Sequence, residues 1–394
     1  MHFALTDEQR ALQDAVRSYL RDRFGPAQVR ALYDAPGSDG VPAELWQAVG
    51  EQGWLAVMVP EEYDGIGLGL LDAAVIARAF GAGTVPGPWL STVLLGEALR
   101  LAGSPEQQRA TLPGLAAGAV KGAVALLAPG SSPTPAGAPV PAPVPASAAT
   151  LSGATLSGAT LSGATLSGRL DLVEHAAVAD LVLVASTDGG LHLVDPRAAG
   201  VTITAHDTLD RTSRLSTITL DGAPSERLAG SSPEVLQQLL DRAAVLVAGD
   251  LVGLSRKALT DTVEYDKTRV QFGKPVGSFQ AVKHELADLH LAVTMAEYAA
   301  TYAAHAADAG LVDAQLAASI AKAKASDVAG DVVGAMIQFH GGIGYTWEHD
   351  AHIYFKRAKR LQYAYGDAVQ HRERIARLAL DPLAVQVAEP AGAA

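Results

Sequence analysis

The chain has 394 residues, of which 49% are hydrophobic and 18% are charged, and its formal net charge is −12. This length and balance predict a globular protein of two or three domains. The acidic charge argues against a nucleic-acid partner, since nucleic-acid-binding proteins concentrate Lys and Arg, and the absence of Cys excludes disulfides and thiolate metal sites.

The N-terminal sequence, MHFALTDEQRALQDAVRSYL, has no basic flank followed by an apolar core, so it does not resemble a signal peptide. No stretch of the chain is apolar for long enough to span a bilayer. The eleven His follow no known ligand spacing, and no metal site is predicted. We therefore expect a cytoplasmic protein without a membrane span.

An amphipathic helix is predicted over residues 3–24. Thr6 can cap it, with Gln9 three positions later as in a capping box, and apolar residues recur every four positions from Leu12 to Leu20. Pro and Gly separate the helices that follow. These helices are predicted over residues 42–53, 70–82, 90–102 and 105–117.

From about residue 120 the pattern changes to short stretches in which apolar and β-branched residues alternate between turn residues. This pattern predicts an antiparallel β domain. The predicted strands cover residues 121–128, 179–186, 190–195, 200–206 and 215–222. After Pro233 the helical pattern returns, over residues 233–268, 279–309, 313–340 and 366–379.

Residues 129–147 are rich in Pro and Ala, so we expect them to be extended or disordered. The sequence ATLSG then occurs four times in tandem over 149–168. Because TLSGRLDLV at the end of the repeat has strand character, we interpret the repeat as an expansion of one native hairpin, with no function of its own. The expected domains are 1–119, 120–230 with an insert at 129–168, 231–385, and a tail at 386–394.

This order of helices, small β domain and further helices resembles that of the acyl-CoA dehydrogenases. LTDEQRALQDAVRSYL, GWLAVMVPEEYDGIGLGLLD and HDTLDRTSRLSTITLDG are similar to segments of that family. The most specific resemblances are YDKTRVQFGKPVGSFQAVKH (265–284) and IQFHGGIGYTWEHD (337–350). The resemblance implies an α+β fold with an N-terminal helical domain, a middle antiparallel β domain and a C-terminal four-helix bundle.

The resemblance also implies FAD as the cofactor and an acyl-CoA thioester as the substrate. In the family's reaction a carboxylate removes the α-proton while the flavin accepts the β-hydride, and hydrogen bonds to the thioester carbonyl stabilise the enolate. An electron-transfer flavoprotein is the expected electron acceptor.

In the family, residues of these two motifs reach across a subunit interface and hold the adenosine–pyrophosphate half of the neighbour's FAD. Arg suits a pyrophosphate because its guanidinium stays charged and bonds in a fork, and glycines allow close backbone approach. The resemblance assigns cofactor contacts to Arg269, Gln271, Phe272, Gln280, Gln338, Gly341, Gly342 and Asp367.

The usual position of the family's catalytic base lies before the last helix, in a sequence like Tyr-Glu-Gly-Thr. Aligning the glycine on Gly366 places Tyr365 where the Glu belongs and Asp367 at the Thr. Tyr has a reference pKa of about 10, so it cannot act as the base at neutral pH. Asp367 remains a candidate base at the wrong position.

The family's alternative base lies ten residues before a helix glycine, here Gly253, which gives Ala243. Asp241 is two positions away, and two positions on a helix rotate a side chain by about 200°. Asp241 is therefore expected to face away from the site. Asp250, in an apolar run, is expected to make a polar contact between helices.

The β domain departs from the family as well. The strands that hold the flavin ring and the CoA ester are normally like Thr-Glu-Pro-Gly-Ala-Gly-Ser-Asp and Trp-Ile-Thr. This sequence has ALLAPGSSP and DLVEHAAVADLVLV instead, with no Trp or Thr at the expected place. The half of the FAD site offered to a neighbour is thus retained, while the half for the chain's own flavin and both base positions are lost.

This asymmetry resembles one subunit of the actinobacterial heterotetrameric (α2β2) acyl-CoA dehydrogenases, several of which act on CoA esters of steroid side chains. The first hypothesis is therefore a subunit that is catalytic only with a paralogous partner. An alternative is a self-sufficient homotetramer whose base is relocated to Asp367 or Asp241. A third hypothesis is a non-catalytic scaffold with the same fold.

Overall fold

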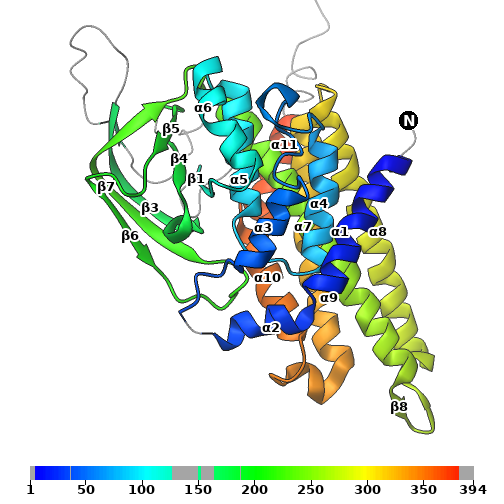
Figure 1. Ribbon diagram of the computed structural model, residues 1–394. Coiled ribbons are helices and arrows are strands. Elements are labelled where there is room, and N and C mark those ends of the chain that lie inside the picture. The colour runs from blue at the N-terminus through cyan, green and yellow to red at the C-terminus, as the bar shows by residue number, and fades with distance from the viewer. Residues whose placement is uncertain (1–4, 36, 127–149, 152–163, 187, 381–394) are drawn as a thin grey trace, which may run out of the picture.

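The computed structural model describes residues 5–35, 37–126, 150–151, 164–186 and 188–380. Helices come first, a β-sheet region follows, and a second helical region ends the described chain, with the sheet lying beside the helices (Figure 1). This arrangement confirms the predicted fold class. The described helices include none that is long and apolar enough to cross a bilayer. The Pro/Ala-rich segment 129–147 and the tail 386–394 lie outside the described residues.

The N-terminal helices follow the predicted ranges closely, with one addition. The capping box is present, since Thr6 Oγ1 accepts a hydrogen bond from Gln9 N at 3.2 Å and Gln9 Oε1 accepts one from Thr6 N at 3.1 Å. No helix was predicted over Pro26–Asp34, although Pro26 at its first position and the buried Val29, Leu32 and Tyr33 indicate one. The helices are α1 (Asp7–Arg23), α2 (Pro26–Asp34), α3 (Ala43–Glu51), α4 (Leu70–Ala82), α5 (Trp89–Ala102) and α6 (Pro105–Ala116).

The sheet has the strand order β1-β4-β5-β7-β3-β2, and β6 pairs with β7. Its strands are β1 (Gly122–Ala125), β2 (Thr150–Leu151), β3 (Ala164–Glu174), β4 (Leu181–Ala185), β5 (Leu191–Val194), β6 (Val201–Ala205) and β7 (Leu215–Arg227). β1 runs parallel to β4, so the prediction of an entirely antiparallel domain is wrong at this pair. A long connection separates the two strands, and parallel pairing requires one.

The described ends of the ATLSG repeat belong to the sheet. Thr150 and Leu151 of the first copy pair antiparallel with Ser167 and Leu166 of the last copy. The last copy continues into β3 as the strand character of TLSGRLDLV predicts, and this pairing agrees with the hairpin interpretation. Residues 152–163 of the repeat lie outside the described residues.

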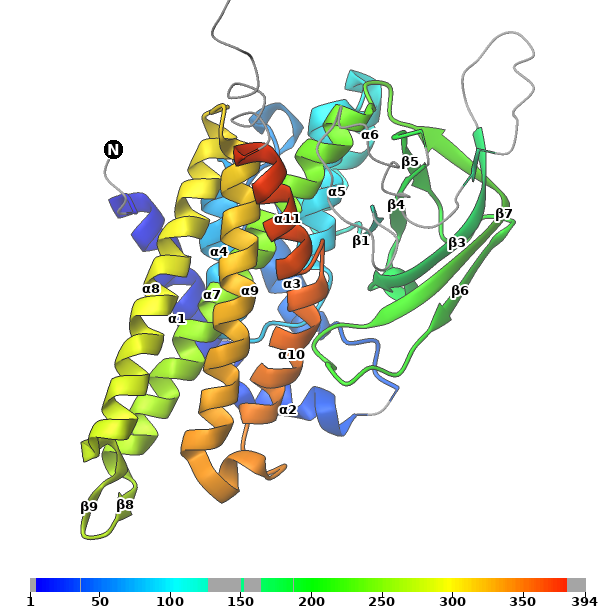
Figure 2. The ribbon, with the colours of Figure 1, turned by 180° about the vertical axis from the view of Figure 1, so that it is seen from behind.

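The C-terminal region is built around three long helices, α7 (Pro233–Thr268), α8 (Gln280–Asp308) and α9 (Ala314–His340). In Figure 2, α10 (Ala351–Tyr363) and α11 (Ala368–Ala379) follow one another beside α9 and complete the bundle. α10 was not predicted. Its inward-facing positions include the buried Arg357 and the largely buried Arg360, which interrupt the apolar pattern of a core-facing helix.

Helices α4 and α7 approach each other through glycines. A Cβ on Gly81 would lie 2.0 Å from the backbone oxygen of Asp250, and a Cβ on Gly253 would lie 1.8 Å from the backbone oxygen of Arg78. Real Cβ atoms do not come so close, so both positions require glycine. The two helices therefore pack backbone against backbone.

Gly253→Ala is expected to lower the free energy of unfolding by about 1–3 kcal/mol, because the added methyl group forces α4 and α7 apart. This cost exceeds the gain of up to about 1 kcal/mol that alanine brings to a helix interior. Gly334→Ala in α9 is the matched control, since its Cβ would meet nothing within 4 Å, and it should stabilise by about 0.5–1 kcal/mol. Urea denaturation of both variants measures the difference, and equal shifts would contradict the close packing.

Candidate functional site

The two motif segments lie at the same end of the bundle, at the far ends of α7 and α9 (Figures 1 and 2). We call residues 269–280 together with 338–342 the bundle tip. The rings of Tyr265 and His340 stack with their centroids 4.4 Å apart, and the Tyr265 hydroxyl donates to the His340 carbonyl at 3.4 Å. This contact joins the ends of the two helices and brings the two segments together.

The first segment of the tip forms a hairpin of β8 (Val270–Gln271) and β9 (Lys274–Pro275). Its two turn residues, Phe272 with φ 52° and Gly273 with φ 78°, both adopt the positive φ of a type I′ turn. The turn leaves Phe272 92% exposed, with its ring edge on Phe279. The hairpin thus presents an aromatic side chain outward.

Four polar side chains of the tip are exposed and unpartnered. The side chains of Arg269, Gln271, Gln280 and Gln338 make no hydrogen bond or ion pair with any residue that the structure describes. Gly341 has a φ of 61°, and a Cβ added to it would meet open space. An unpaired guanidinium beside free amides and open backbone fits a phosphate-bearing ligand.

Large exposed apolar side chains lie near the tip and, separately, on one face of α8. Leu291, Met295 and Tyr298 recur at helical spacing and are 62%, 54% and 50% exposed, so they form one face of α8. A contiguous apolar surface of this kind is typical of a protein–protein interface. Near the tip, the exposed apolar side chains are Val270, Ile343, Tyr345 and Trp347.

A second candidate region lies between the β-sheet and the α10–α11 junction, where a cavity of about 560 Å³ opens. We call it the interdomain cleft. Its lining includes Leu126 and Leu172 from the sheet side and Tyr363, Tyr365 and Asp367 from the helical side. The structure therefore places Asp367 in this cleft, apart from the other predicted cofactor contacts at the bundle tip.

Tyr365, at the family's usual position of the catalytic base, lies in the wall of the cleft. Its φ of 55° and the φ of 98° at Gly366 form a sharp turn before α11. Burial raises the pKa of the Tyr365 phenol above its ordinary value, and the neighbouring Glu174 carboxylate raises it further. Tyr365 therefore stays protonated and can donate a hydrogen bond but cannot remove a proton.

Asp367 is the N-cap of α11. Its Oδ1 accepts a hydrogen bond from Gln370 N at 2.8 Å, and Gln370 Oε1 accepts one from Asp367 N at 2.9 Å. This capping box engages one carboxylate oxygen of Asp367 and stabilises the N-terminus of the helix. The residue touches the cleft while serving a structural role.

Asp241 points to α11 and does not line the interdomain cleft. Its Oδ2 accepts a hydrogen bond from Arg374 Nη2 at 3.0 Å and its Oδ1 one from Gln237 Nε2 at 3.2 Å. Burial raises the pKa of Asp241, and Arg374 offsets part of this effect. Ala243 is buried in the core and offers no functional group. The helical base position is thus apolar, and the nearby Asp241 belongs to a structural ion pair.

Asp250 makes the helix–helix contact that the sequence predicts. Its two carboxylate oxygens accept hydrogen bonds from Arg357 of α10 in a bidentate pair, with Nε 3.1 Å from Oδ1. Arg357 Nη1 also donates to the Val85 carbonyl and to Thr212 Oγ1, each at 2.9 Å. The pair joins α7 and α10 to the loop before β7.

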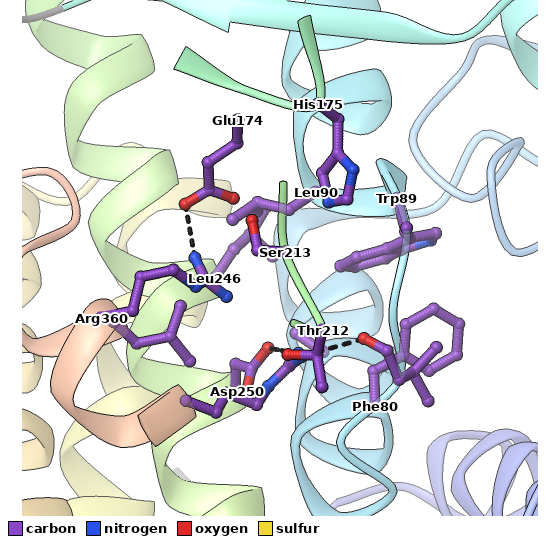
Figure 3. A pocket seen from close by; sticks show the side chains of 15 residues that line it. Phe80, Trp89, Leu90, Glu174, His175, Thr212, Ser213, Leu246, Asp250 and Arg360 are labelled. Atoms are coloured by element: carbon purple, nitrogen blue, oxygen red, sulfur yellow. Dashed lines mark hydrogen bonds and ion pairs between the residues drawn. The ribbon is translucent and has the colours of Figure 1, made fainter. Parts of the chain in front are cut away.

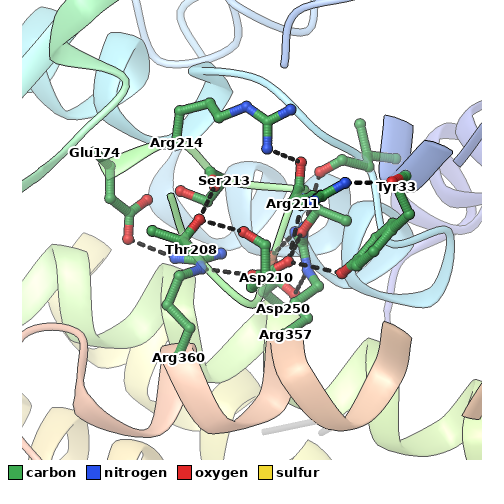
Figure 4. A network of polar contacts seen from close by, with 12 residues as sticks. Tyr33, Glu174, Thr208, Asp210, Arg211, Ser213, Arg214, Asp250, Arg357 and Arg360 are labelled. Carbon is green, nitrogen blue, oxygen red and sulfur yellow. Dashed lines mark hydrogen bonds and ion pairs between the residues drawn. The ribbon is translucent and has the colours of Figure 1, made fainter. Parts of the chain in front are cut away.

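The sequence did not predict the ion network at the floor of the cleft (Figure 4). Arg360 of α10 pairs with Glu174 at the end of β3, and its Nε donates to Asp210 Oδ2 at 2.7 Å. Asp210 also accepts hydrogen bonds from Thr212 N and Oγ1. Although burial opposes it, Arg360 lowers the pKa of Asp210, so the network is ionic. The network fixes the sheet to α10.

Behind this network, residues of α4, α5 and α7 surround a small pocket (Figure 3). A cavity of about 30 Å³ remains, and Phe80, Trp89 and Leu246 form its apolar walls. Burial lowers the pKa of His175 beside it to about 3, so this imidazole is neutral. A cavity of this size holds water and not an acyl chain.

Comparison with known proteins identifies the family. The acyl-CoA dehydrogenase N-terminal domain matches residues 6–119, and the acyl-CoA dehydrogenase C-terminal domain matches residues 234–380. Acyl-CoA dehydrogenase IpdE2 of Mycobacterium tuberculosis is 34% identical over 354 residues, which cover 89% of this chain and 91% of the relative.

Two solved structures are similar over nearly the whole chain. A variant of the steroid acyl-CoA dehydrogenase Tcur3481-Tcur3483 is 30% identical, with a TM-score of 0.83 over 96% of this chain and 99% of that chain. The ChsE4-ChsE5 complex of Mycobacterium tuberculosis is 27% identical, with a TM-score of 0.83 over the full length of both chains. With identity and coverage of this extent, the chain belongs to the acyl-CoA dehydrogenase family.

Proposed function

We propose that this chain is the subunit of a heteromeric acyl-CoA dehydrogenase that completes the FAD site of a paralogous partner and lacks a catalytic base of its own. The observation that carries the proposal is the contrast between the bundle tip and the interdomain cleft. The bundle tip presents unpartnered Arg269, Gln338 and open glycine backbone. The interdomain cleft holds a closed ion network and a protonated Tyr365.

The residues at the bundle tip fit the pyrophosphate half of FAD. Arg269 would pair with the phosphates in a fork, and Gln271, Gln280 and Gln338 would donate amide hydrogen bonds. Phe272 would pack on the dinucleotide, and Gly341 and Gly342 would allow its close approach. Bound there, FAD supplies the hydride acceptor for α,β-dehydrogenation of an acyl-CoA thioester, with an electron-transfer flavoprotein as the next acceptor.

The described carboxylates of the interdomain cleft already have structural partners. Glu174 and Asp210 pair with Arg360, Asp171 pairs with Arg169, and Asp367 caps α11. This chain therefore positions a cofactor, while the carboxylate that removes the α-proton comes from the partner. The names of two similar structures describe paired proteins, which supports an α2β2 assembly.

The exposed apolar face supplies the contact surface for such an assembly. Leu291, Met295 and Tyr298 form this face on α8, and Tyr345, close in sequence to the second segment of the tip, is 90% exposed. A partner helix packed on this face would bury apolar area next to the FAD contacts. Partner binding and cofactor binding would thus both involve α8, which begins at Gln280.

Arg269→Ala in the complex with the paralogous partner should weaken FAD binding by about 10–100-fold, because one charge-assisted hydrogen-bonding group to the pyrophosphate is lost. FAD retained per complex after gel filtration, and its titration by fluorescence, measure the effect. Arg109→Ala, an exposed arginine on α6, is the matched control and should retain FAD fully.

The same experiment separates the alternatives. A non-catalytic scaffold predicts unchanged FAD content in the Arg269→Ala complex. A self-sufficient enzyme predicts that the chain purified alone binds stoichiometric FAD and oxidises an acyl-CoA, and that Asp367→Asn or Asp241→Asn reduces turnover. Activity of the isolated chain would overturn the proposal.

A further inference from the structure

A cavity of about 580 Å³ lies where α1, α2, α4, α7 and α10 meet, and we call it the helical pocket. None of the residues that line it belongs to the bundle tip or the interdomain cleft. Its size falls within the range of about 300–1,000 Å³ that is typical of small-molecule sites. Its inner wall is apolar and consists of residues between 1% and 6% exposed, namely Leu20, Phe24, Val29, Ala79, Ile353 and Tyr354.

The rim of the helical pocket is basic. Arg17 and Arg21 of α1 stand on one side, and Arg256 and Lys257 of α7 on the other. Asp350 is the one carboxylate among the described lining residues, and it is already paired with Arg30. The pocket therefore combines an apolar interior with an excess of positive charge at its mouth.

The positive charge of the rim is neutralised only in part. Arg21 pairs with Asp22 and Lys257 with Asp261, whereas Arg17 and Arg256 do not each have a carboxylate of their own. Glu297 of α8 accepts hydrogen bonds from both Arg78 and Arg256, at 2.7 and 2.8 Å, so one carboxylate serves two guanidinium groups. Arg17 has no ion pair or hydrogen bond with any described residue. Burial lowers the pKa of Arg78, and the charges of Arg17 and Arg256 lower it further.

The buried Arg78 also has an unused donor. Its side chain is 6% exposed, and its Nε has no hydrogen-bond partner among the described residues. Arg78 is not among the residues that line the helical pocket, so its unmet donor is not part of the proposed site, which consists of the lining cations and the apolar wall.

We propose that the helical pocket binds an amphipathic organic anion, with its apolar chain against Leu20, Val29 and Ile353 and its acidic group between Arg17 and Arg256. A carboxylate or a phosphate head group would satisfy the same donors. This site is separate from the proposed FAD contacts and does not rest on the proposed function. It would give the chain a second ligand, bound beside the contact between α4 and α7.

The full-length chain is titrated calorimetrically with dodecanoate, dodecyl phosphate and dodecanol, each below its aggregation concentration. Both anions are expected to bind one per chain, and the neutral alcohol at least about ten-fold more weakly, because it lacks the charge that the rim recognises. The ratio between the two anions distinguishes a carboxylate site from a phosphate site. Equal binding of the alcohol and the acids would overturn the proposal.

Two variants locate the site. Arg17→Glu should weaken both anions by about ten-fold or more and leave the alcohol unchanged, whereas Arg23→Glu, on the same helix but outside the pocket, should alter neither. Ala82→Phe, which fills the pocket without changing its charge, should weaken all three ligands. If both Arg17→Glu and Ala82→Phe bind the two anions with wild-type affinity, the proposal is wrong. Both variants should retain the wild-type FAD content in the complex with the paralogous partner, which separates this test from that of the bundle tip.

Discussion

Replacing Arg360 with methionine is expected to lower the free energy of unfolding by about 3–5 kcal/mol. The guanidinium pairs with Glu174 at the end of β3 and with Asp210 in the loop before β7, and the Arg360 and Asp210 side chains are 13% and 3% exposed. Without Arg360, two carboxylates share a poorly hydrated space and repel one another. The sheet would lose its main polar attachment to α10.

A triple variant tests whether the loss comes from unpaired charge. Arg360→Met combined with Glu174→Gln and Asp210→Asn removes the whole ionic network, and it should recover most of the stability that the single variant loses, since replacing a complete buried network is often nearly neutral. Urea denaturation of the three proteins at constant pH measures the difference. A single variant as stable as the wild type would show that the network contributes little to the attachment of the sheet.

The bundle tip could be predicted from sequence because its residues are local. Arg269 to Gln280 form one continuous stretch. Glycine readily adopts a positive φ, so the turn at Gly273 could be expected from the residue type. In a short motif of this kind, the local sequence alone determines the turn and the exposure of the side chains. The second segment, with Gln338 and Gly341, lies beside the first because Tyr265 stacks on His340. No local sequence pattern shows this contact.

The ion network could not be predicted because its members are far apart in the chain. Arg360 lies 150 positions from Asp210 and 186 from Glu174. A charged residue in isolation is ordinarily read as solvent-exposed, and nothing near these three indicates burial. The same property concealed α10, where Arg357 and Arg360 occupy positions that an amphipathic pattern reserves for apolar residues.

For Asp250, the sequence predicted that a polar contact exists but not which residue makes it. An Asp within an apolar helical run must find a partner, because an unpaired buried carboxylate is too costly, so a polar interhelical contact followed from the sequence. The identity of Arg357, 107 positions away, did not. The rotation of about 200° between Asp241 and Ala243 likewise predicted the direction of Asp241 but not its pairing with Arg374.

Arg374→Met is the second substitution for which a loss of about 3–5 kcal/mol is expected. Arg374 is 1% exposed, and besides Asp241 it donates to Ser319 Oγ at 3.1 Å and to Gln315 Oε1 at 3.4 Å. Removing it leaves the Asp241 carboxyl without its counter-ion at the contact between α7 and α11. Adding Asp241→Asn to the variant should restore most of the loss.

The pH dependence of this variant distinguishes an unpaired charge from a simple packing defect. Burial already raises the pKa of Asp241 in the wild type, and losing Arg374 raises it further, so the folded variant holds a proton that the unfolded chain releases above about pH 4. Where the unfolded state binds fewer protons, stability falls as pH rises, by up to about 1.4 kcal/mol per unit for one group. Between the two folded pKa values the deficit of Arg374→Met should therefore grow with pH. A packing defect would give a constant deficit from pH 5 to pH 8, and Asp241→Asn in the same background should abolish the slope.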